Sequence, residues 1–186
     1  MTDDDALGAA LLARARNAIG MEFGIAPFPE PDHPALHQPG ATFVTLTQDG
    51  QLRGCIGSLE AWRPLCEDVE ANARAAAFRD PRFASLAREE LDRTRVEVSL
   101  LTAPVQLEYA DEADAIRRMR PGIDGMIFEC QGRRGTFLPQ VWDGLPDPRQ
   151  FFAHLKQKAG FPPGFWSPDV RLYRYEVRKW KEPAKN

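Results

Sequence analysis

The sequence predicts an α+β fold, in which helices pack on a mainly antiparallel sheet. Strand-like runs occur in pairs, and helical stretches lie between the pairs. Asp49-Gly50 separates the runs of one pair, and Gly132 separates the runs of another. Both signals are typical of hairpin turns, which join antiparallel strands. The 186 residues suit one domain, or two small ones that share a core.

The first predicted hairpin contains the most unusual stretch of the chain. After a strand-like run over 42–47, the sequence Leu-Arg-Gly-Cys-Ile-Gly returns over 52–57. Because alternate side chains of a strand share a face, we expect Arg53 and Cys55 on one face. The other face then carries Leu52, Gly54 and Ile56. The glycines favour a bulge, or the close approach of a backbone or a ligand.

The remaining elements follow from apolar spacing and from residues typical of helix ends. Helices are predicted over 5–19, 64–78, 85–91, 111–121 and 147–160. Ser85 and Asp147 are the expected caps of two of them. Further strands are predicted over 95–101, 125–130, 135–138 and 170–180. Five prolines between residues 24 and 40 predict an extended surface loop.

The placement of histidine and cysteine does not predict a metal site. His33 and His37 have a spacing that joins two ligands only on a helix, and Pro34 disfavours a helix there. The three cysteines are Cys55, Cys66 and Cys130. Their number and separation indicate neither a disulfide framework nor a Cys-x-x-Cys motif. We therefore expect no metal and no cofactor.

Composition narrows the class of protein further. A hydrophobic content of 43% and a charged content of 27% are ordinary for a globular protein. The net charge of −3 makes nucleic acid an improbable partner, because such binders usually carry a basic excess. No apolar run approaches the roughly 20 residues that cross a bilayer. The acidic start of the chain is unlike a signal peptide, so we expect a cytoplasmic location and no membrane partner.

Seven short stretches can be read together. In chain order they are Phe43-Val44-Thr45-Leu46, Leu52-Arg53-Gly54-Cys55-Ile56-Gly57, Asp80-Pro81-Arg82-Phe83, Val98-Ser99-Leu100-Leu101-Thr102, Gly122-x-x-Gly125, Thr136-Phe137-Leu138-Pro139-Gln140-Val141 and Lys158-Ala159-Gly160. Their combination resembles the AMMECR domain family from about residue 5 to residue 180. Arg-Gly-Cys-Ile-Gly is the signature of that family. One branch, which the chain resembles, belongs to the AmmeMemoRadiSam system of bacteria and archaea.

The resemblance implies a single AMMECR-type domain over 1–186, built of two subdomains around a shared groove. The larger subdomain would cover roughly 5–105, with a return of the C-terminal strand, and the smaller one roughly 106–169. The expected partners are a Memo-type protein, similar to iron-dependent ring-cleaving dioxygenases, and a radical SAM protein. The resemblance implies no particular reaction, substrate or oligomeric state.

Cys55 is the candidate catalytic residue, as a nucleophile or a covalent carrier. Arg53 on the same face, and Arg82 if its loop folds back, would favour the thiolate form. The alternative is that Cys55 packs as a small apolar residue, because cysteine is among the most buried residue types. A Cys-His hydrolase is disfavoured, because His154 matches no family motif and has the surroundings of an ordinary helix-face residue.

The candidate ligand-binding residues are Arg53, Gly54, Gly57, Asp80, Arg82 and Lys158. We expect three cations, Arg53, Arg82 and Lys158, to line the groove with Cys55 and to bind a small anion. Each has a structural alternative. Asp80 and Arg82 suit a loop ion pair, with Phe83 plugging the core, and Lys158 suits the negative end of a helix.

Two functions from different classes remain open. The first is a cysteine-dependent enzyme or carrier that works with a radical SAM partner. The second is a non-catalytic ligand-binding or adaptor module. An RNA-binding reading of Gly54-x-x-Gly57 as a KH loop is weaker, because KH loops join two helices and this one lies in a predicted strand.

Overall fold

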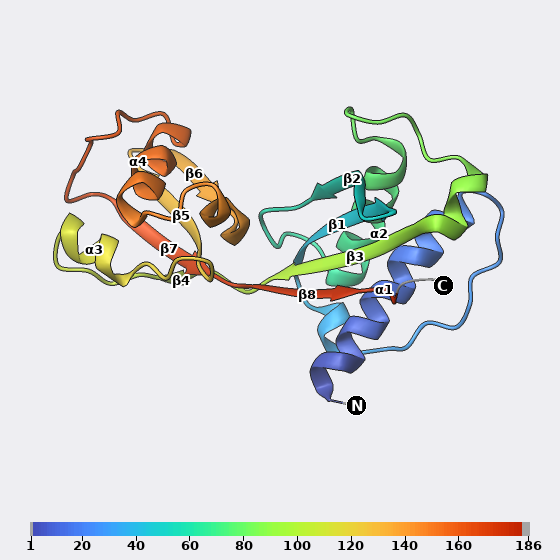
Figure 1. The fold of residues 1–186 in the computed structure, drawn as a ribbon. Helices are drawn as coiled ribbons and strands as arrows, with labels where there is room; N and C mark the ends of the chain where they lie inside the picture. Colours follow the sequence, from blue (N-terminus) through green and yellow to red (C-terminus); the bar gives the residue numbers. More distant parts are fainter. Residues whose placement is uncertain (1, 184–186) are drawn as a thin grey trace. The chain divides into compact units, whose positions relative to one another are not determined.

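The computed structural model describes residues 2–183. These residues form two compact units, each with its own sheet, helices and core (Figure 1). Unit 1 contains the chain up to Leu101 and the residues from Arg178 onward, and unit 2 contains Thr102–Val177. The chain therefore leaves unit 1 once, and it returns with its last strand.

Unit 1 is built on a sheet of strand order β2-β1-β3-β8. The strands are β1 (Ala41–Gln48), β2 (Gln51–Gly57), β3 (Thr94–Leu101) and β8 (Val177–Lys181). The helices are α1 (Asp3–Met21), α2 (Leu65–Phe78) and the short 3₁₀ helices η1 (Pro34–His37) and η2 (Arg88–Arg93). The predicted turn is confirmed, because Asp49 and Gly50 both have positive φ, as a tight two-residue hairpin turn requires.

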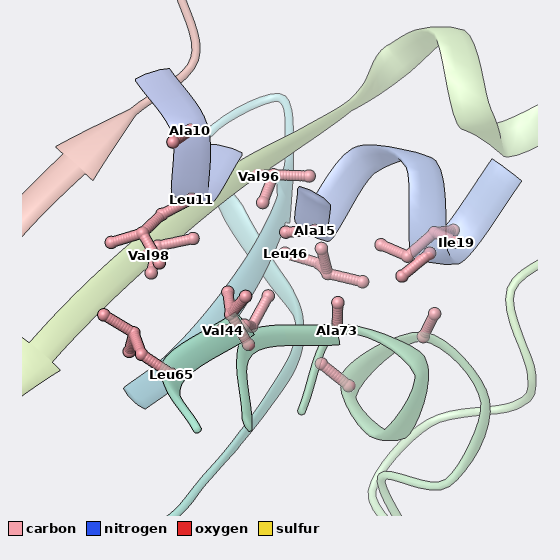
Figure 2. Close-up of a cluster of buried hydrophobic side chains, with 14 of the residues drawn as sticks. Ala10, Leu11, Ala15, Ile19, Val44, Leu46, Leu65, Ala73, Val96 and Val98 are labelled. Atoms are coloured by element: carbon pink, nitrogen blue, oxygen red, sulfur yellow. The ribbon is translucent and has the colours of Figure 1, made fainter. Parts of the chain in front are cut away.

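The core of unit 1 lies between one face of this sheet and the helices α1 and α2 (Figure 2). Leu11 and Ile19 of α1 pack with Val44 and Leu46 of β1, and all four side chains are fully buried. Each buried aliphatic side chain of this size stabilises the fold by about 1.5–3 kcal/mol. The apolar stripe predicted for the first helix is therefore confirmed. Thr2 begins that helix through a capping box with Asp5.

Two local predictions in unit 1 are wrong. η1 begins at Pro34, where we expected extended chain, because proline fits the first turn of a helix, where its missing N–H is not needed. Ser85 does not cap a helix. Its hydroxyl donates to the carbonyl of Phe78, and η2 begins three residues later, at Arg88.

Unit 2 is built on a second antiparallel sheet, of order β4-β7-β5-β6. The strands are β4 (Val105–Gln106), β5 (Gly125–Cys130), β6 (Arg133–Phe137) and β7 (Arg171–Tyr175). The helices are α3 (Glu112–Arg118), η3 (Pro139–Asp143) and α4 (Pro148–Lys158). Asp147 caps α4 as predicted, by accepting a hydrogen bond from the N–H of Arg149. The core is rich in aromatic rings, such as the stacked pair Trp142 and Phe151.

The last predicted strand, 170–180, is two strands. The break falls at Glu176, and β7 belongs to the sheet of unit 2 whereas β8 belongs to the sheet of unit 1. The segment contains no proline, glycine or turn dipeptide, so nothing in its composition marks the break. The α+β class and the antiparallel pairing are confirmed.

Candidate functional site

Two side chains close the outer edge of β2 at Cys55. The Asp80 carboxylate accepts a hydrogen bond from the Cys55 N–H at 2.9 Å. Nη2 of Arg82 donates to the Cys55 carbonyl at 3.2 Å. β2 is the last strand on its side of the sheet that the described residues form, so these side chains take the positions of a neighbouring strand. We call this arrangement of Asp80 and Arg82 around the Cys55 peptide the edge clamp.

The edge clamp is itself an ion pair. Asp80 is only 4% exposed, and it also accepts from Nη2 of Arg82 at 2.7 Å and from Nε at 3.0 Å. These Arg82 bonds hold the pKa of the Asp80 carboxyl well below its ordinary value, and the Cys55 N–H lowers that pKa further against the opposing effect of burial. Asp80 is therefore ionised throughout the physiological pH range.

A second ion pair lies beside the clamp. Nε and Nη2 of Arg53 both donate to the Glu90 carboxylate at 3.0 Å. This bidentate contact, with the Ala87 N–H as the next contribution, lowers the pKa of Glu90 to about 2. The guanidinium carbons of Arg53 and Arg82 lie 5.9 and 5.6 Å from the ring centre of Phe83. The two arginines thus flank one aromatic ring, and each already has a carboxylate partner.

The Cys55 thiol lies on the sheet face opposite α1 and α2. Its sulfur is 3.2 Å from Oγ1 of Thr45, the residue directly across the β1–β2 ladder. Glu97 lies opposite Thr45 on β3, so the three side chains form one row across the sheet. None of them belongs to the apolar core, and Cys55 is partly exposed. The thiol is therefore not packed as a core residue.

The two signature glycines have structural reasons for their identity. A Cβ at position 54 would lie 2.1 Å from the backbone oxygen of Ala76, so Gly54 lets α2 pack directly on β2. A Cβ at position 57 would lie 2.2 Å from the ring of Phe43. Both glycines therefore permit close packing. At position 54 the close neighbour is a backbone, which is one of the uses predicted for these glycines. Their role in ligand binding stays a prediction.

The alternation predicted for β2 is wrong at Leu52, which is 43% exposed. Leu46 pairs with Gly54 but the next residue, Thr47, pairs with Leu52. Arg53 is thus the extra residue of a β-bulge, which resets the alternation of side chains. Gly54 faces α2.

The fold has counterparts in known proteins. The AMMECR1 family model matches residues 12–180. The chain belongs to the AMMECR1 family. A crystal structure of an uncharacterised protein from Pyrococcus horikoshii, 34% identical, superposes with a TM-score of 0.76 and covers 95% of this chain and 92% of that one.

Similar archaeal proteins also match along most of their length. A protein of Methanothermobacter thermautotrophicus is 41% identical over 153 residues, which are 79% of this chain and 78% of the relative. A protein of Aeropyrum pernix is 41% identical over 188 residues, which are 96% of this chain and 80% of the relative. The AMMECR1 domain is therefore shared, but the relatives' names state no activity.

The remaining predicted site residue of this AMMECR1-family chain, Lys158, lies in unit 2. It is exposed at the end of α4, with Nζ 5.1 Å from the ring centre of Phe137. Its grouping with Arg53 and Arg82 in a shared groove stays a prediction. Among residues 2–183 no cluster of three or more His, Cys, Asp or Glu side chains could hold a metal ion. Within the same range, no helix is long and apolar enough to cross a membrane.

A buried cluster of hydrogen-bonded polar side chains, which we call the hub, lies at the end of β2 and was not predicted from the sequence. Asp68 of α2 is fully buried, and its carboxylate accepts hydrogen bonds from Thr42, Ser58, Arg63 and Asn72. Ser58 directly follows the signature stretch, so the hub fixes the exit of β2 against α2. The available signal was the four-residue spacing of Asp68 and Asn72, which places two polar residues on one helix face.

Proposed function

We propose that Cys55 is the reactive thiol of this AMMECR1-family protein and acts as a nucleophile or a covalent carrier. The observation that carries the proposal is the edge clamp. It fixes the N–H of Cys55 through the buried Asp80 carboxylate and the carbonyl through the exposed Arg82 guanidinium, while Cys55 stays partly exposed outside the core. A reactive group held on a rigid strand needs little reorganisation when a substrate arrives.

A cation and a hydroxyl group lie beside the Cys55 sulfur. The pKa of Arg82 is raised, first by its hydrogen bond to Asp80 and to a smaller degree by its Coulomb interaction with Cys55. The Thr45 hydroxyl at 3.2 Å can donate a hydrogen bond to that sulfur. In the described residues no histidine contacts Cys55, so the arrangement favours a carrier or trapping role over Cys-His hydrolysis.

We further propose that the protein works in an AmmeMemoRadiSam-type system in the cytoplasm. The Memo-type and radical SAM proteins would deliver or receive the group that Cys55 carries. A small anion would bind Arg53 and Arg82 through the donors that their carboxylates leave open. Arg82, for example, binds Asp80 through Nε and Nη2, and its side chain is 54% exposed.

The proposal is tested by co-expressing the chain with the Memo-type and radical SAM proteins of one organism. Intact-mass and peptide mass spectrometry then measure adducts on the purified chain. We expect an adduct on Cys55 that is absent from Cys55→Ser, with Cys66→Ser as the matched control because both thiols are partly exposed. Equal modification of wild type and Cys55→Ser, or no adduct in the three-protein system, would contradict a carrier role.

A non-catalytic adaptor is the second candidate, and the surface beside β2 favours it. Trp62 is 71% exposed in the segment between β2 and α2, its ring lies 4.7 Å from the Arg63 guanidinium, and Leu59 nearby is 43% exposed. Tryptophan and arginine are frequent hot spots of protein interfaces. An adaptor predicts that Trp62→Ala abolishes co-purification with the partners while Cys55→Ser leaves it intact and no adduct forms.

A further inference from the structure

A second candidate site lies wholly within unit 2 and includes none of the signature residues. At the end of its sheet, the β5–β6 turn and the start of β7 enclose a hollow of about 630 Å³. Its charged lining consists of three arginines, Arg133, Arg134 and Arg171, and two carboxylates, Glu129 and Asp169. We propose that this hollow binds a small molecule that carries a doubly charged oxyanion group, such as a phosphate or a pair of carboxylates.

The turn fixes the position of the first cation. Gln131 and Gly132 both have positive φ, at 49° and 75°, so the hairpin reverses in two residues. Arg133 therefore pairs directly with Cys130 across the ladder. This register keeps the arginine beside the hollow rather than on a longer, mobile loop.

Arg133 is also held in place by its side chain. Nη1 donates to the carbonyl of Gly160 at 2.6 Å, and the guanidinium carbon lies 3.9 Å from the ring centre of Phe161. The stacked, hydrogen-bonded guanidinium has lost part of its rotamer freedom before any ligand arrives. Its remaining N–H groups can donate to an anion at a smaller entropic cost than those of a free surface arginine.

The charge balance of the hollow favours an anion. Glu129 lies between two arginines in register, Arg134 on β6 and Arg171 on β7. Its carboxylate pairs with Nε of Arg134 at 3.3 Å. Arg171 is exposed, and no ion pair or hydrogen bond of its side chain occurs among residues 2–183. Since three guanidiniums face only two carboxylates, the lining keeps an excess positive charge.

Geometry sets the ligand class. A guanidinium presents paired N–H donors that match two oxygens of a phosphate or carboxylate. The volume is within the range of small-molecule sites, roughly 300–1,000 Å³. A single chloride would leave the paired donors unsatisfied, whereas an oxyanion with two charges can engage Arg133 and Arg171 together.

The test is a titration of the intact protein, followed by backbone-amide NMR shifts, with inorganic phosphate in one arm and succinate in the other. Ionic strength is held constant with chloride, because screening weakens exposed charge pairs. We expect saturable shifts at residues 129–134 and 169–171 in at least one arm, and the stronger arm identifies phosphate or dicarboxylate as the preferred group. The absence of saturable shifts there in both arms would overturn the proposal.

Substitutions of single arginines test which of them bind the anion. Arg171→Gln and Arg133→Gln should each weaken binding by about fivefold or more, in line with the loss of one charge-assisted hydrogen bond. Arg149→Gln is the control, because Arg149 is an exposed arginine of α4 outside the hollow. The affinity of this variant for the anion should stay within about twofold of that of the wild type. If Arg133→Gln loses its native spectrum, Arg171→Lys replaces it and tests the paired donors at constant charge. Unchanged affinity in Arg171→Gln would overturn the proposal.

Discussion

The carboxylate of Asp80 and the backbone N–H of Cys55 are joined by a hydrogen bond of 2.9 Å at the edge of the unit 1 sheet. Together with Arg82, which donates to the carbonyl of the same residue, Asp80 satisfies both backbone groups that an edge strand leaves open. The family motifs around residues 55 and 80 are thus two halves of one structure. The strand supplies the peptide, and the loop after α2 supplies the clamp.

Removal of the Asp80 carboxylate from the edge clamp should lower the stability of the fold. Asp80→Ala leaves the Cys55 N–H without its acceptor and Arg82 without its counter-ion, so we expect a loss of about 2–3 kcal/mol in the free energy of unfolding. Urea denaturation measures this loss. Asp32→Ala is the control, because the Asp32 side chain is 72% exposed, and its effect should stay within about 0.5 kcal/mol. Equal stability of the two variants would show that the clamp is not structural.

The Glu90–Arg53 pair predicts how stability depends on pH. The pKa of Glu90 is lowered from 4.5 to about 2, so its contribution is present above pH 4.5 and is lost as the pH falls toward 2. Wild type should therefore exceed Glu90→Gln in unfolding free energy at neutral pH, and the difference should shrink across that window. Denaturation curves at several pH values measure it. A difference that is constant from neutral pH down to about 2 would contradict the ion pair.

The signature glycine at position 54 should tolerate no side chain. In Gly54→Ala the new methyl group would lie 2.1 Å from the backbone oxygen of Ala76, which cannot move without displacing α2. We expect a loss of roughly 2 kcal/mol or more, at the upper end for overpacked cores. Gly164→Ala is the matched control, because nothing lies within 4 Å of a Cβ there. If both variants unfold at the same denaturant concentration, the helix does not pack on β2 as described.

The two residues of a buried ion pair in unit 2 should differ in how strongly their substitution lowers stability. Lys156 is 1% exposed, pairs with Glu112 and lies with Nζ 4.5 Å from the ring centre of Phe152. Glu112→Ala leaves that charge unpaired and should cost about 3 kcal/mol, whereas Lys156→Met replaces the charge with an apolar chain of similar volume. We expect Lys156→Met to stay within about 1 kcal/mol of wild type in thermal unfolding. The reverse order would contradict the burial of this pair.

The elements were largely predictable from the sequence because apolar spacing and helix caps are local signals. The pairing at the site was not. A two-residue turn at Asp49-Gly50 with regular pairing would place Gly54 opposite Thr45, and only the bulge at Arg53 moves Cys55 to that position. The glycines of this stretch favoured a bulge as one of several uses, but its position at Arg53 depends on tertiary packing and could not be predicted from the sequence.

The ion-pair partners of the predicted site residues were also difficult to predict from the sequence. Arg53 and Arg82 were chosen as cations that face a thiol, but the structure pairs them with Glu90 and Asp80. Glu90 lies 37 positions from Arg53, so no local pattern joins the two. Asp80 is two residues from Arg82, and the ion pair weighed as their structural alternative is present.

The central claim is that Cys55 is the reactive thiol, and limited alkylation of the native protein at neutral pH tests it most directly. Peptide mass spectrometry reports the order in which the free thiols of Cys55, Cys66 and Cys130 are modified. Cys66 shares the partial exposure of Cys55 but lacks the clamp, so it controls for access. We predict that Cys55 reacts first, about tenfold faster than Cys66, because a cation and a hydroxyl donor beside a sulfur favour its reactive anionic form. If Cys55 stays unmodified while Cys66 or Cys130 reacts, the thiol is a packing residue and the adaptor function is the better account.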